Sequence, residues 1–192
     1  MKHLSLLAVS ALTASACATD DGEFIDRASE VEGIYQVKSH LLNAQSCSPG
    51  GTPFSDQHGF AFAKRNTILG HEYLHIYSCA SLDDCRQKAA LEQFEGNISF
   101  SYTLSGLDGD VLTGFEVTTG FTSTNGLCTM PELSNLVMKV DGAELSIEKS
   151  TKIGRDYPSD SGVCSTDKGR EASEAASCSQ METLKATLVE AL

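Results

Sequence analysis

The chain has 192 residues, with 26 Asp or Glu against 14 Lys or Arg, so its formal net charge at pH 7 is −12. Such an acidic protein would be repelled by nucleic-acid phosphates and by a bare anionic membrane, which excludes the nucleic-acid-binding classes. A chain of this length buries one good hydrophobic core, so we expect a single folded domain and a monomer.

The first 16 residues have the layout of a secretory signal peptide. Lys2 precedes an apolar run from Leu4 to Leu12, which is too short to cross a bilayer as a helix. The small residues Ala14-Ser15-Ala16 are typical of a cleavage site. Cleavage there would leave 13 basic and 26 acidic residues, because the removed segment holds one Lys and no acid, and the mature net charge would be −13.

Cys17 would become the new N-terminus. The segment resembles the lipobox of bacterial lipoproteins, with Ala14 where Leu is commonest. The resemblance implies diacylation of Cys17 and a lipid anchor in the cell envelope, at the outer membrane or the periplasmic face. Without acylation the protein would be secreted. The chain has seven cysteines, an odd number, and a lipid on Cys17 would leave six to pair.

The mature chain begins with a polar, acidic stretch, and residues 17–32 are predicted to form a flexible tether with at most one short helical turn. The folded domain is expected over 33–192. Its first strand is predicted at Gly33–Asn43, where β-forming residues alternate. The opening Gly33-Ile34-Tyr35 resembles the Gly-x-Trp entry of lipocalins, with Tyr in place of Trp, and the β-rich layout is compatible with that family.

Turn residues and hydrophobic periodicity divide the rest of the domain. Asp-Gly pairs at 108–109 and 141–142 predict hairpins, and Ser81 begins a capping box. Seven to nine strands with two short helices predict a mainly β fold, an antiparallel meander forming a barrel or sandwich. Further strands are expected at 60–62, 68–78, 98–104, 111–119, 136–140, 143–150 and 181–190, helices at 85–94 and 167–177, and loops at 46–53 and 157–165.

Six cysteines in an oxidising compartment predict three disulfides. Cys79 and Cys85 close a ring of seven residues and are expected to pair at a strand–helix corner. Cys164 and Cys178 flank the second predicted helix, which would hold them more than ~10 Å apart, beyond the reach of a disulfide. Cys164 and Cys178 should therefore pair with Cys47 and Cys128, in an order that the sequence leaves open.

The segment His71-Glu72-Tyr73-Leu74-His75 resembles the His-Glu-x-x-His motif of zincins. On a helix, His71 and His75 would face one way and hold Zn²⁺, with Glu72 as general base and Glu95 as third ligand. That alternative implies a small secreted zinc metallopeptidase.

The flanking residues favour a strand for this segment. Gly70 precedes the motif, helix-poor residues follow it, and Ser81 already begins the next helix. On a strand the motif supplies no metal site, so we expect no cofactor and no catalytic residue.

The sequence as a whole favours a membrane-anchored lipoprotein of the bacterial cell envelope with a non-catalytic β domain. The corner at Cys79 to Cys85 and the Cys-Ser-Thr-Asp at 164–167 are similar to features of small uncharacterised bacterial lipoproteins. The expected partners are the bilayer, through acyl chains, and a small ligand or another envelope protein. The sequence does not specify the ligand.

Overall fold

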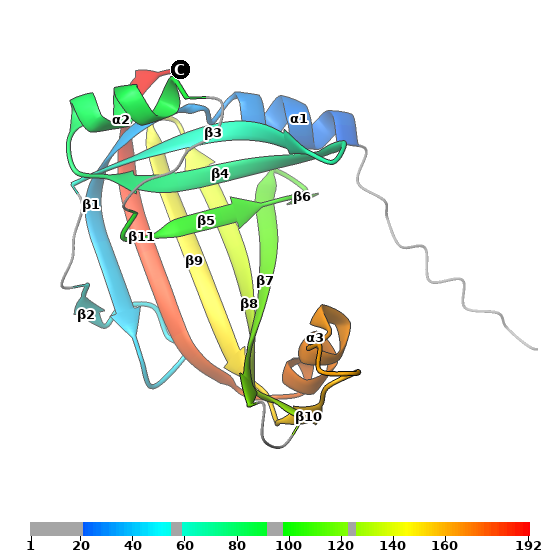
Figure 1. Ribbon diagram of the computed structural model, residues 1–192. Coiled ribbons are helices and arrows are strands. Elements are labelled where there is room, and N and C mark those ends of the chain that lie inside the picture. Colours follow the sequence, from blue (N-terminus) through cyan, green and yellow to red (C-terminus); the bar gives the residue numbers. More distant parts are fainter. Residues whose placement is uncertain (1–20, 55–58, 92–97, 123–125) are drawn as a thin grey trace, which may run out of the picture.

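The computed structural model describes residues 21–54, 59–91, 98–122 and 126–192 (Figure 1). This part of the chain is mainly β and contains eleven strands and three short helices. The helices are α1 (Asp21–Ser29), α2 (Leu82–Ala89) and α3 (Thr166–Glu174). The strands are β1 (Gly33–Asn43), β2 (Thr52–Pro53), β3 (Phe60–Ile68), β4 (His71–Cys79), β5 (Ser101–Leu104), β6 (Gly106–Asp108), β7 (Val111–Thr122), β8 (Leu127–Asp141), β9 (Glu144–Ile153), β10 (Tyr157–Pro158) and β11 (Cys178–Ala191).

All the strands form one antiparallel sheet that curls back until its ends nearly meet. The order is β5-β4-β3-β1-β11-β9-β8-β7-β6, with β2 added to β1 and β10 added to β8. Only Ser105 separates β5 from β6 in the chain, and its N–H donates to the Thr113 carbonyl of β7 at 2.9 Å. The expected antiparallel meander is therefore confirmed, and its form is a nearly closed barrel.

Alternation of apolar and polar residues decides which face of each strand turns inward. In β8, Leu136 and Met138 are buried, whereas the intervening positions are half-buried or exposed. Met138 pairs with Ile147 of β9, which is also buried. Gly142, at φ 58°, closes the predicted hairpin between these strands because glycine adopts this conformation without steric cost.

Helix α1 packs against one end of the barrel, and this corrects the expected tether. Phe24, Ala28 and Val31 are buried in the main core, where the Tyr35 hydroxyl donates to the Val31 carbonyl at 2.8 Å. Residues 21–32 therefore do not form a flexible tether: the segment is polar in composition, but its few apolar residues fall on one helical face. The rest of the expected tether, residues 17–20, and the expected signal peptide lie outside the described residues.

Helices α2 and α3 cover the outer face of the sheet. Ser81 caps α2 by accepting from the Asp84 N–H at 3.1 Å, as the capping box predicts. Ser165 is the N-cap of α3 but makes no side-chain cap bond. The Ser173 hydroxyl of α3 donates to the Pro131 carbonyl of β8 at 2.8 Å. No helix in the described ranges is long and apolar enough to cross a membrane.

Several predicted boundaries are wrong, and pairing partners explain the strands that are longer than expected. The strands expected at 60–62 and 136–140 extend over β3 and the fifteen residues of β8, because neighbouring strands supply hydrogen bonds through polar stretches. The expected loop at 46–53 contains the short β2, and β10 begins the expected loop at 157–165. Three helices replace the two expected.

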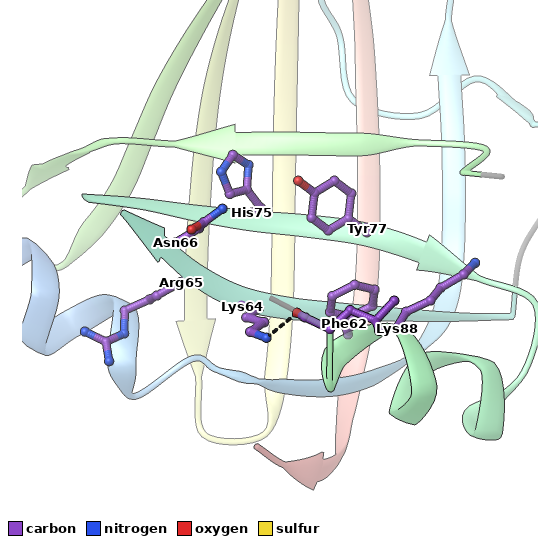
Figure 2. Close-up of a pocket in the computed structure, with 8 residues that line it drawn as sticks. Phe62, Lys64, Arg65, Asn66, His75, Tyr77 and Lys88 are labelled. Carbon is purple, nitrogen blue, oxygen red and sulfur yellow. Dashed lines mark hydrogen bonds between the residues drawn. The ribbon is translucent and has the colours of Figure 1, made fainter. Parts of the chain in front are cut away.

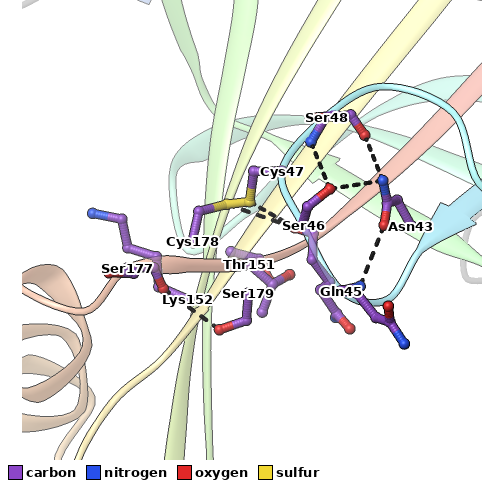
Figure 3. Close-up of a disulfide and its surroundings, with 12 residues drawn as sticks. Asn43, Gln45, Ser46, Cys47, Ser48, Thr151, Lys152, Ser177, Cys178 and Ser179 are labelled. Carbon is purple, nitrogen blue, oxygen red and sulfur yellow. Dashed lines mark hydrogen bonds between the residues drawn. A yellow bond between two sulfur atoms is a disulfide. The ribbon is translucent and has the colours of Figure 1, made fainter.

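Three disulfides join the six cysteines. Cys79 and Cys85 pair at the corner between β4 and α2, with Cα atoms 5.3 Å apart, as expected. The other two disulfides are Cys47–Cys178 and Cys128–Cys164, and they decide the pairing that the sequence left open. No bond joins Cys164 to Cys178, as expected from the helix between them. Figure 3 shows Cys47–Cys178, which joins the loop after β1 to the start of β11.

Candidate ligand-binding site

The His-Glu-x-x-His segment lies on β4, which confirms the predicted strand. Residues four apart on a strand are ~13 Å apart, whereas on a helix they are neighbours. His71 and His75 lie on the outer face of the barrel, and Glu72 accepts a hydrogen bond from Thr67 at 2.6 Å. The helical zinc site is therefore wrong for these residues. Glu95 lies outside the described residues, and no group of three potential ligands within the described ranges is placed to hold a metal.

His75 belongs to a row of stacked rings on the outer face of β4, beside α2. Its ring lies 5.9 Å from that of Tyr73 and 5.6 Å from that of Tyr77, and burial lowers its pKa, so the imidazole is neutral at pH 7. Figure 2 shows this recess, in which Lys64 donates to the Leu91 carbonyl at 2.8 Å. Lys64 also donates to the carbonyl of Ala89, the last residue of α2, at 2.7 Å. The recess is small, with a volume of about 30 Å³, and the two hydrogen bonds of Lys64 hold the end of α2 against β3.

A second polar cluster lies inside the barrel and joins three strands that are far apart in the sequence. His40 of β1 places Nε2 2.8 Å from a Glu182 carboxylate oxygen of β11. The Tyr102 hydroxyl of β5 donates to the same carboxylate oxygen and lies 3.1 Å from His40 Nε2. His40 is 2% exposed and Tyr102 is 1% exposed, so these two side chains form a buried base of the cluster that water does not reach.

Aromatic rings enclose the imidazole of His40. Phe54 stacks on it with ring centres 4.0 Å apart, and Phe100 meets it edge-on at 4.7 Å. Nδ1 of His40 is buried and has no hydrogen-bond partner within the part of the chain that the structure describes. A buried polar atom without a partner costs free energy, so this nitrogen is an exception among the buried polar atoms of the barrel.

Charged residues extend this cluster along the inner face. Lys149 of β9 is the direct cross-strand partner of Glu182, and its ammonium lies 2.6 Å from a carboxylate oxygen of Glu116 on β7. The three side chains are 20%, 17% and 30% exposed, respectively, so they lie between the buried base and solvent. We call these five residues the inner polar cluster: His40, Tyr102, Glu116, Lys149 and Glu182.

The ionisation of the inner polar cluster follows from burial and close charges. Burial favours the neutral form of Glu182, but hydrogen bonds from His40 and Tyr102 and the charges of His40 and Lys149 outweigh it and hold its pKa below the ordinary value. Burial, followed by the negative charges of Glu182 and Glu116, raises the pKa of Tyr102 far above its ordinary range. At neutral pH Glu182 is therefore a carboxylate and Tyr102 a protonated phenol.

Sequence reasoning missed this cluster, although part of its signal was available. Lys149 continues the inward-facing series of Leu145 and Ile147, and Glu182 continues that of Leu184. A charged residue at an inward position of a barrel strand is unusual and could have been singled out.

Nothing matches this chain among protein-family models, curated proteins or solved structures.

Proposed function

We propose that this protein is a lipoprotein of the bacterial cell envelope, anchored by acyl chains on Cys17, whose barrel binds a small polar ligand without catalysis. The observation that carries the binding role is the inner polar cluster, half buried beside the apolar core of the barrel. Replacement of buried charged groups by apolar residues of similar volume is often neutral or stabilising, so charged groups at this position favour a role in recognition.

The charges of the cluster favour a ligand that carries a positive group. Two carboxylates of the cluster, those of Glu116 and Glu182, lie between its buried residues and solvent, and the chain as a whole is acidic. Nδ1 of His40, which has no hydrogen-bond partner among the described residues, and the surrounding rings suit a molecule with one polar edge and one flat or apolar part. An amine or another small organic cation combines these properties.

The binding role is tested with protein purified under native conditions from its own cell envelope. Mass spectrometry of the intact complex should show a small molecule bound to the wild type, and Glu182→Gln should carry much less of it. Glu148→Gln is the matched control, because Glu148 is exposed on the outer face of β9. A wild-type protein without a bound small molecule, or equal loading of both variants, would count against ligand binding at this site.

The anchor is tested separately by Cys17→Ser. Acylation requires the thiol, so the variant should leave the membrane fraction and appear in the soluble envelope fraction. A variant that stays with the membrane would show that another feature holds the protein there.

A further inference from the structure

The turn between β3 and β4 carries two exposed apolar residues at a position where polar residues or glycine are usual. Leu69 is 96% exposed and has φ 54°, and Ile68 is 43% exposed. A two-residue turn with positive φ favours Asn-Gly or Gly-Gly, since a branched side chain is strained there. Leucine therefore does not help to form the turn, and its exposure requires another explanation.

This turn lies at the end of the barrel where α1 begins. Phe24 of α1 lines a shallow groove together with His71 and Tyr73, which follow the turn directly. Figure 1 shows the β3–β4 turn beside the first residues of α1, with α3 and β10 at the opposite end. Phe115 of β7 lines the same groove and is 54% exposed, so a third apolar side chain faces solvent near the start of α1.

The proposed anchor would place a bilayer close to this end. Cys17 precedes Asp21, the first residue of α1, by four residues, and four residues span at most about 14 Å. An acylated Cys17 thus holds the α1 end of the barrel within about that distance of the lipid surface. At such a short tether length even a weak contact is populated, because the effective concentration of the membrane is high.

We infer that the β3–β4 turn, through Ile68 and Leu69 and together with Phe115 of the neighbouring groove, inserts into the interface of the bilayer to which the protein is anchored. This inference rests on the proposed acylation of Cys17. It gives the anchored barrel one orientation, with α1 toward the lipid and α3 away from it. Glu23 and Asp26 of α1 are exposed at the same end, so zwitterionic lipid is the favoured surface.

The chain contains no tryptophan, so a single introduced tryptophan reports on its own surroundings. Mature Leu69→Trp protein is coupled through the Cys17 thiol to a maleimide lipid in phosphatidylcholine vesicles; the other six cysteines are in disulfides. On coupling, the emission should move to shorter wavelength and be quenched by brominated phosphatidylcholine. Val163→Trp is the matched control: Val163 is 65% exposed and lies next to α3, so its emission should not change.

Unchanged emission from Leu69→Trp on the vesicles would overturn the inference, as would equal changes at both positions. Ile68→Trp replaces the first variant if circular dichroism shows that Leu69→Trp is unfolded. The acylation of Cys17 is tested by a different experiment, the release of Cys17→Ser from the membrane fraction of cells. Chemical coupling supplies the tether in the vesicle experiment, so the two failures are distinguishable.

Discussion

Glu182 is the residue on which the inner polar cluster depends. Its carboxylate accepts hydrogen bonds from His40 and Tyr102 and lies opposite Lys149 on the neighbouring strand. Removal of the charge would leave the two donors of His40 and Tyr102 with a weaker acceptor in a desolvated position. Hydrogen bonds to a charged group contribute about 1.5–3 kcal/mol each, so the carboxylate matters for stability as well as for binding.

We expect Glu182→Gln to lower the free energy of unfolding at pH 7 by about 1–3 kcal/mol. The pKa of Glu182 is lowered in the folded state, so the unfolded chain binds more protons as the pH falls below the ordinary value of 4.5. The contribution is present above that pH and is lost as the pH falls through the folded pKa. Urea unfolding at pH 7 and pH 3 should therefore show a smaller gap between wild type and variant in acid, and a constant gap would refute this account.

At the scale of elements, α1 is part of the barrel core. Phe24 is 4% exposed and packs in the main cluster, so Phe24→Ala should destabilise the protein by about 3–5 kcal/mol. Ile25→Ala, on the half-buried side of the same helix, should cost much less. Thermal or urea unfolding of both variants checks this expectation. Similar small losses for both would show that α1 is only loosely attached.

The closure of the sheet depends on a close approach between β5 and β7. A side chain at Gly114 would collide with the backbone of Thr103, whereas one at Gly59 would meet no atom of the described residues within 4 Å. We expect Gly114→Ala to lower the free energy of unfolding by about 1–3 kcal/mol and Gly59→Ala to leave it within about 0.5 kcal/mol. Equal effects of the two substitutions in urea unfolding would mean that β5 and β7 are not in close contact at Gly114.

For the whole molecule, the disulfides differ most in the length of chain that they close. Cys47 and Cys178 are 131 residues apart, and Cys79 and Cys85 are six apart. In the chain-entropy treatment, replacing the long-range pair with serines should cost about 5 kcal/mol and replacing the short-range pair about 2 kcal/mol. Unfolding of the two double variants measures this difference. A larger loss from the short-range pair would show that local strain or packing outweighs chain entropy.

The sequence by itself determined the features that depend on near neighbours in the chain: the hairpin at Asp141-Gly142, the Ser81 cap and the disulfide at the Cys79 to Cys85 corner. Only the tertiary structure decided that α1 packs on the barrel and that His40 meets Glu182, 142 residues away. Strand register and barrel closure bring such residues together, and local periodicity does not specify either, because it records only which face of a strand a residue occupies.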